Sequence, residues 1–151
     1  MELVQPGHTN PHGTVFGGQV VQWIDLAASL AAQRHCRRMV VTAAIDALSF
    51  RAPIHVGEWA VLSAVVNRTW LSSLEVQVAV EAEHPLTGMR RRAVDAYLTF
   101  VALGDDGRPV QVPAFVPSTP EERSRWEGAE ARRVARLALR AGTVGDPKVV
   151  P

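Results

Sequence analysis

The chain has 151 residues, of which 47% are hydrophobic, and this length fits one domain with a single core. Its formal net charge of +1 gives no electrostatic reason to expect nucleic acid or an anionic membrane as a partner. The single cysteine excludes an intrachain disulfide, and no apolar run reaches the roughly 18 residues of a membrane helix, so we expect a cytoplasmic protein.

The first regular element that the sequence predicts is a helix that follows a loop. Residues 6–18 are rich in Gly, Pro and Asn, which is typical of a loop. From Gly17 to Arg38, apolar residues recur at helical spacing and cover most of the circumference. We therefore expect a helix that is buried on nearly all sides, and its many alanines allow another element to approach it closely.

The middle of the chain predicts an antiparallel sheet. Turn sequences separate four segments rich in β-branched and apolar residues, at 40–50, 58–69, 73–83 and 93–103. The third segment alternates apolar and polar residues almost strictly, as a strand with one solvated face does. Short connections favour antiparallel pairing, and we expect residues 1–5 to add a short strand before the helix.

The last part of the chain predicts a charged helix. Thr119 and Glu122 have the spacing of a capping box, Pro120 suits a first turn, and the charged segment continues to about Arg140. The complete order is a loop, one buried helix, four or five strands and a terminal helix. This order indicates an α+β hotdog fold, in which an antiparallel sheet of about five strands wraps around one central helix.

Asp25 is the main candidate for a catalytic carboxylate. It lies in the middle of the apolar helix, where a carboxylate must be paired, hydrogen-bonded or protonated because burying an isolated charge is very costly. A structural ion pair would explain it equally well. The second candidate is the pair Gly17-Gly18, because free N–H groups at a helix N-terminus bind anions and glycine lets a substrate approach; a flexible helix entry is the alternative.

The spacing of these candidates has a consequence for assembly. Asp25 follows Gly17 by eight residues and so lies about 12 Å further along the helix axis. A catalytic carboxylate and an oxyanion donor must each lie about 3 Å from the reacting atoms, so one helix cannot present both to one carbonyl. If both act, the site combines Gly17 of one chain with Asp25 of another, and two antiparallel helices related by a two-fold axis form two equal sites.

Asn10 and Ser29 are weaker candidates. Asn10 lies seven residues before Gly17, where it can polarise a carbonyl or position a water, although Asn-Pro is also a common turn pair. Ser29 lies one turn after Asp25 and either holds the attacking water or bonds a helix carbonyl, of which the second is favoured. No metal site is expected, because a proline between the two loop histidines prevents the helix that would bring them together.

Four segments resemble the acyl-CoA hydrolase branch of the hotdog thioesterases, the branch of brain acyl-CoA hydrolase and its bacterial relatives. They are NPHGTVFGGQVVQWID, VVTAAIDALSFRAPIHVGE, SSLEVQVAVEAE and DAYLTFVALGDDGRPVQVP. The resemblance implies hydrolysis of acyl-CoA to a carboxylic acid and CoA, without a metal or other cofactor. It implies catalytic roles for Asn10 and Asp25, and a dimer of hotdogs that often grows into a hexamer, a trimer of dimers.

The resemblance also assigns roles within the expected site. Asp25 acts as a general base on water or attacks the thioester directly, and both roles stay open. The N–H groups of Gly17 and Gly18 hold the oxyanion. We expect the CoA phosphates and pantetheine to contact Arg51, Arg90, Arg91, Arg92, Ser72 and Ser73. Trp70 and Leu71 depart from the family pattern of a Gly and a polar or basic residue, and Trp70 either stacks on adenine or packs in the core.

Two alternatives use the same fold. A non-catalytic acyl-CoA sensor would bind the substrate without turnover, but such a sensor normally needs an output domain. A dehydratase acting on acyl chains typically pairs a His with a carboxylate, and His35 lies too far along the helix from Asp25. We therefore expect a hotdog thioesterase domain over residues 1–117, a charged helix over 118–141 and a flexible tail over 142–151.

Overall fold

The computed structural model describes residues 1–142 and contains five strands and two α-helices. The strands are β1 (Glu2–Leu3), β2 (Met39–Phe50), β3 (Trp59–Thr69), β4 (Ser73–Glu83) and β5 (Arg90–Leu103). The 3-10 turn η1 (Pro6–His8) and helix α1 (Gly17–Cys36) lie between β1 and β2, and helix α2 (Pro120–Gly142) follows β5. The order agrees with the prediction, except that η1 was expected to be irregular loop. Most of the expected tail, from residue 143 on, lies outside the described residues.

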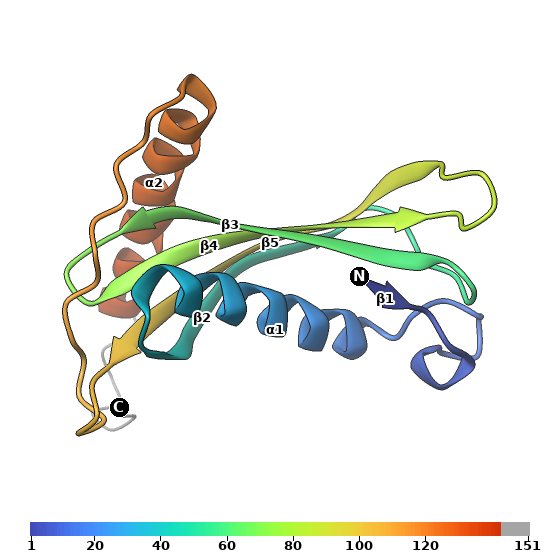
Figure 1. The fold of residues 1–151 in the computed structure, drawn as a ribbon, viewed down its shortest axis with the longest axis horizontal. Coiled ribbons are helices and arrows are strands. Elements are labelled where there is room, and N and C mark those ends of the chain that lie inside the picture. The colour runs from blue at the N-terminus through green and yellow to red at the C-terminus, as the bar shows by residue number, and fades with distance from the viewer. Residues whose placement is uncertain (143–151) are drawn as a thin grey trace.

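The strands form one antiparallel sheet in the order β1-β3-β4-β5-β2. Helix α1 runs along one face of the curved sheet, and α2 lies against the opposite face (Figure 1). This is the hotdog arrangement that the element order predicted. Among residues 1–142, neither helix combines the length and the apolar character needed to cross a bilayer.

Helix α1 packs one face against the sheet and leaves another open. The buried stripe consists of Val20, Trp23, Ile24, Ala28, Ala32 and Cys36. Leu26 and Leu30, on the other side of the helix, are 55% and 56% exposed. The expectation of a helix buried on nearly all sides is therefore wrong for a single chain. The spacing of apolar residues shows which faces of a helix are apolar. It does not show which of these faces packs against the chain's own sheet and which is left exposed.

Strand β2 forms a long edge of the sheet and contains two bulges. The register with β5 shifts between Thr42 and Ala44 and again between Ile45 and Ala47. Side chains of a regular strand alternate, so Thr42 and Asp46 would share one face. Instead, Thr42 bonds a side chain of α1, whereas Asp46 bonds a side chain of α2 on the opposite face. The bulges thus connect the edge strand to both helices.

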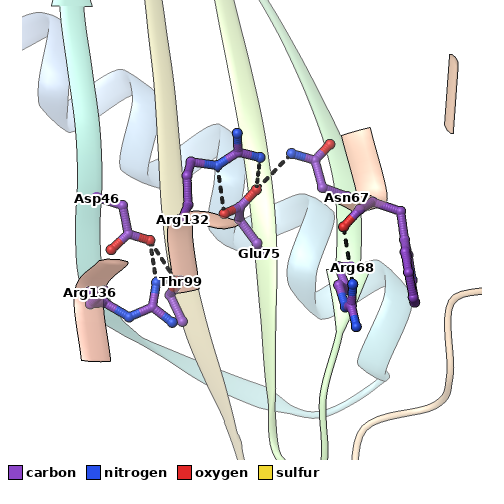
Figure 2. Close-up of polar contacts among 8 residues, drawn as sticks. Asp46, Asn67, Arg68, Glu75, Thr99, Arg132 and Arg136 are labelled. Carbon is purple, nitrogen blue, oxygen red and sulfur yellow. Dashed lines mark hydrogen bonds and ion pairs between the residues drawn. The ribbon is translucent and has the colours of Figure 1, made fainter. Parts of the chain in front are cut away.

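Two buried charge pairs attach α2 to the sheet (Figure 2). Glu75 on β4 is fully buried and accepts hydrogen bonds from Arg132 of α2 at 2.7 and 3.0 Å and from Asn67 at 2.8 Å. Asp46 accepts hydrogen bonds from Arg136 and from Thr99. The outer face of β4, which its alternation predicted to be solvated, is therefore covered where Glu75 lies.

Candidate active site

The Asp25 carboxylate lies on the side of α1 that faces β2, and it is partly exposed. Its Oδ1 accepts a 2.7 Å hydrogen bond from the Thr42 hydroxyl. This confirms that the carboxylate is hydrogen-bonded and shows that the partner is neutral rather than an arginine. The single bond to Oδ1 fixes the carboxylate's orientation, and Oδ2 accepts no hydrogen bond from the described residues.

Thr42 was missed in the sequence. It lies in a run of apolar residues where threonine is also an ordinary strand former. The available signal was the buried-helix aspartate itself, which needs a donor from the strand that follows the helix. Which residue of that strand supplies the donor depends on the bulges, and they leave no clear mark in the sequence.

The start of α1 opens into a hollow of about 380 Å³, which we call the N-terminal hollow. Its lining is largely apolar and includes Val15, Gly17, Val20, Phe50, Ile54 and Val94, together with Thr14 and Arg51. The first N–H groups of a helix have no intrahelical acceptor, and neither Gly17 nor Gly18 donates its N–H to another described residue. Gly17 thus offers a free donor beside an apolar wall, as an oxyanion site requires, whereas Gly18 lines a separate hollow with Phe16.

Asn10 organises the loop that leads to this hollow. Its Oδ1 accepts the N–H groups of His12 and Thr14 at 2.9 and 3.3 Å, and its Nδ2 donates to the Thr14 hydroxyl at 2.9 Å. The turn role considered for Asn10 is thus present. One Nδ2 hydrogen is left for another acceptor, because the amide nitrogen carries two. Since Thr14 lines the hollow, Asn10 lies beside it.

Asp25 and Gly17 do not converge within one chain. Both belong to the same straight element, separated by eight residues and therefore by about 12 Å along the axis. Ser29 does not connect them either, because its hydroxyl donates to the Leu26 carbonyl at 2.9 Å, as the favoured alternative expected. Within the described chain the two groups of candidate residues, Asn10 with Gly17 and Asp25 with Thr42, thus stay apart.

The arginines expected to hold CoA phosphates are engaged by carboxylates. Arg51 and Arg92 both bind Asp95. Burial raises the pKa of this carboxyl group, but the hydrogen bonds from the two arginines outweigh burial, and the pKa is lowered. Arg90 binds Glu83 at 2.6 Å, and Arg91 binds Glu58 at 2.6 Å. The Arg91 hydrogen bond, helped by the His55 N–H, lowers the pKa of Glu58 against the effect of burial. Each of these four guanidinium groups thus has a carboxylate partner, and Arg51 and Arg92 share one.

Ser72 and Ser73 lie at the β3–β4 connection, and they are half-buried. Trp70, beside them, donates its indole N–H to Glu130 of α2 at 3.0 Å, and the Arg133 guanidinium lies 4.8 Å from its ring. Trp70 therefore packs beneath α2, which corresponds to the packing alternative rather than to stacking on a nucleotide. Leu71 is exposed at the tip of this connection.

Residues 12–89 match the sequence profile of the thioesterase superfamily. The chain belongs to this superfamily. It is 47% identical over 119 residues to the uncharacterized acyl-CoA thioester hydrolase YkhA of Bacillus subtilis, covering 79% of this chain and 69% of the relative. It is 34% identical over 144 residues to the human cytosolic acyl coenzyme A thioester hydrolase, covering 94% of this chain but only 38% of that longer protein.

Two solved structures extend the likeness to the fold. An apo hexameric acyl-CoA thioesterase superposes with a TM-score of 0.89 at 40% identity, covering 93% of this chain and 90% of that chain. The acyl-CoA hydrolase of Staphylococcus aureus, solved with butyryl-CoA, CoA and CoA disulfide, superposes with a TM-score of 0.87 at 35% identity, covering 94% and 87%. Thioesterase membership and the hotdog fold are thereby established.

Alanine variants of the Staphylococcus aureus hydrolase have been solved at one asparagine, one aspartate and one threonine. The asparagine precedes the aspartate by 15 positions, and the threonine follows it by 17. Asn10, Asp25 and Thr42 have the same two spacings in this chain. In this chain, Asn10 lies beside the N-terminal hollow, and the Thr42 hydroxyl donates a hydrogen bond to the Asp25 carboxylate.

Proposed function

We propose that this chain is an acyl-CoA thioester hydrolase that releases free CoA and a carboxylic acid, using no metal or other cofactor. The observation that carries the proposal is the Thr42–Asp25 hydrogen bond, which leaves the second carboxylate oxygen free on an open side of α1. The names of the relatives and the matching spacing of the three substituted residues in the Staphylococcus aureus hydrolase support it.

The chemistry follows from two half-sites, Asn10 with Gly17 and Asp25 with Thr42. Asp25 takes the proton of a water that attacks the thioester carbonyl carbon, or its carboxylate attacks that carbon directly. The carbonyl oxygen becomes an oxyanion held by the N–H groups of Gly17 and Gly18, each worth about 3 kcal/mol, with the remaining Asn10 amide hydrogen beside them. Collapse of the intermediate breaks the C–S bond, and the CoA sulfur leaves as a thiolate, which in the general-base route takes up the proton held by Asp25. In the direct route the acyl group stays on Asp25 as an anhydride, and water then hydrolyses this anhydride to the free carboxylic acid, with the released proton going to the thiolate.

We propose that the half-sites meet across a dimer. The outer side of α1 presents Leu26, and the neighbouring edge of β2 presents Val41 and Ile45, all more than two-fifths exposed. A long apolar edge strand invites pairing with another chain. A two-fold axis that sets the α1 helices antiparallel would bring Gly17 of one chain to Asp25 of the other, twice. The hexameric relative supports a further trimer of such dimers.

The substrate class and location follow the relatives. The Staphylococcus aureus hydrolase was solved with butyryl-CoA and CoA, which supports acyl-CoA as the substrate here. The human relative is named as cytosolic, which supports a cytoplasmic location. The N-terminal hollow is apolar enough to receive the acyl chain next to the thioester.

The test is release of CoA thiol from acyl-CoA by the parent chain and by Asp25→Asn. The amide keeps the size of the side chain but removes the base and the nucleophile, so we expect the rate to fall by at least about 10³-fold. An unchanged circular dichroism spectrum controls for folding. A parent chain that binds acyl-CoA but never releases thiol would instead favour the non-catalytic sensor.

A further inference from the structure

A cluster of three arginines at the end of α1 has no role in the half-sites described above. Arg34 lies in the last turn of the helix, and Arg37 and Arg38 follow its end. All three are exposed, and none forms an ion pair or a side-chain hydrogen bond with a residue in 1–142.

Eight other arginines of the described chain bind a carboxylate, whereas these three do not, and the remaining unpaired arginines are scattered along α2. The carboxylate-bound set is Arg51, Arg68, Arg90, Arg91, Arg92, Arg108, Arg132 and Arg136. The C-terminal end of α1 favours cations, which explains one basic residue but not three that lie side by side without a counter-charge. Three adjacent uncompensated guanidinium groups form a ready binding site for phosphate.

The cluster surrounds a hollow of about 740 Å³, which we call the arginine hollow. The three arginines line it together with the Gln33 amide, and Leu30, Met39 and Leu103 supply an apolar part. Asp105 is the one carboxylate in the lining, so the arginines outnumber it by three to one. A ligand that combines phosphates with an apolar or flat portion matches both parts of this lining.

The backbone at Arg37 provides an independent sign that its side chain matters. Arg37 has φ 53° and ψ 34°, and it is the one residue other than glycine with positive φ in the described chain. Its N–H closes the helix on the Gln33 carbonyl at 2.7 Å. Glycine is the usual residue at such a helix end, and another residue there costs about 1 kcal/mol. A cost accepted at a surface position points to a role for the side chain.

We propose that Arg34, Arg37 and Arg38 bind the phosphates at the nucleotide end of CoA. This rests on the proposed thioester hydrolysis and extends it to the far end of the substrate. Arg34 lies nine residues after Asp25, about 14 Å along α1, and the helix end lies about 17 Å away. The pantetheine arm places roughly 13 bonds between sulfur and the first phosphorus, or about 16 Å when extended. The two lengths agree.

The proposal agrees with the carboxylate pairing of Arg51 and Arg90 to Arg92, which lie far from the arginine hollow. Their carboxylate partners hold them at the other end of the sheet, where they secure turns and strand ends. Ser72, by contrast, lies beside the end of β5, since its carbonyl accepts the Ala102 N–H at 3.0 Å. Met39 pairs with Leu103 on the other side of β5, so Ser72 and the arginine hollow share one end of the sheet.

The test is binding of desulfo-CoA, which carries every phosphate but cannot be hydrolysed, measured by calorimetry. The key variant is Arg37→Gly, because it removes a cation and suits the left-handed backbone, so its Tm should stay the same or rise. The triple variant adds Arg34→Gln and Arg38→Gln to this change. We expect its Kd for desulfo-CoA to be about tenfold or more above that of the parent, and the salt dependence of binding to weaken. The control is Arg123→Gln, an exposed arginine of α2, which should bind as the parent does.

The outcomes separate this proposal from the proposed hydrolysis. Hydrolysis of acyl-pantetheine, which lacks the phosphates, should be equal in the parent and the triple variant. The proposed arginine site is wrong if the triple variant binds desulfo-CoA as tightly as the parent. It is also wrong if the parent itself does not bind desulfo-CoA. A parent that binds desulfo-CoA through these arginines but releases no thiol supports the site while the hydrolase proposal fails.

Discussion

The Thr42 hydroxyl donates a 2.7 Å hydrogen bond to the Asp25 carboxylate, joining the edge strand β2 to the middle of α1. A bond of this kind to a charged group contributes about 1.5–3 kcal/mol. We expect Thr42→Val to lower kcat by about 10- to 100-fold with little change in KM, because the carboxylate loses its orientation. Thr42→Ser keeps the hydroxyl and should retain most activity in the same steady-state assay. Equal rates for both variants would show that the bond has no catalytic effect.

The substitution Gly17→Ala tests the proposed oxyanion half-site. A Cβ at this position would meet the Phe50 Cζ at 3.5 Å, an ordinary contact, so Gly17→Ala should fold normally. The methyl group would occupy the N-terminal hollow where the thioester must approach the N–H groups. We expect kcat/KM to fall by about 10²-fold, since a displacement of about 1 Å has that effect. Gly7→Ala is the matched control, because a Cβ there meets nothing within 4 Å.

The Glu58 carboxylate contributes to the pH dependence of the free energy of unfolding in acid. Hydrogen bonds from Arg91, and the His55 N–H, lower its pKa below the ordinary value of 4.5. A carboxylate with a lowered folded-state pKa stabilises the fold above about pH 4.5, and this contribution is lost as the pH falls through the folded-state pKa. We expect Glu58→Gln to lower the free energy of unfolding by about 1.5–3 kcal/mol at neutral pH.

The measurement for Glu58 is urea denaturation of parent and variant at neutral pH and at about pH 3. The difference between them should shrink in acid, because the parent's carboxylate becomes protonated. Glu127→Gln, at an exposed position on α2, controls for the loss of one charge. A difference that stays constant over this range would contradict the role given to the Glu58–Arg91 pair.

The buried Glu75–Arg132 pair fixes α2 to the sheet. Arg132→Met would leave a fully buried carboxylate with the Asn67 amide alone, which costs about 3–5 kcal/mol. We expect the double variant Glu75→Gln with Arg132→Met to be clearly more stable than Arg132→Met, because no unpaired charge is left. Urea midpoints of the three chains check this order. A double variant no more stable than the single one would show that the charge is compensated elsewhere.

The sequence predicted the elements well where their signal is local. The alternation in β4, the apolar run of α1 and the capping box at Thr119 and Glu122 all lie where the structure has them, and the Glu122 N–H donates to the Thr119 hydroxyl at 3.1 Å. Local periodicity and capping report backbone geometry directly. Asp25 was singled out because a carboxylate is unusual in an apolar helix, whereas the catalytic role of Asn10 came from the family resemblance, and both roles stay predictions.

What the sequence did not predict depends on contacts between distant segments. The bulges that turn Thr42 toward Asp25 follow from the pairing of β2 with β5. The engagement of Arg91 by Glu58, and the burial of Glu75 beneath Arg132, join residues at least 33 positions apart. Composition reveals that arginines are numerous, but only the folded chain shows which of them have a carboxylate partner and that three without one line a single hollow at the end of α1.

The central claim is that each site combines Gly17 and Asn10 of one chain with Asp25 of another. Coexpression of an Asp25→Asn chain with an Asn10→Ala chain, each with its own affinity tag, tests it directly. Random pairing makes half of the dimers mixed, and each mixed dimer has one intact site, so we expect about a quarter of the parent's thiol-release rate from two nearly inactive variants. A mixture that releases no more thiol than the two variants separately would show that both half-sites act within one chain.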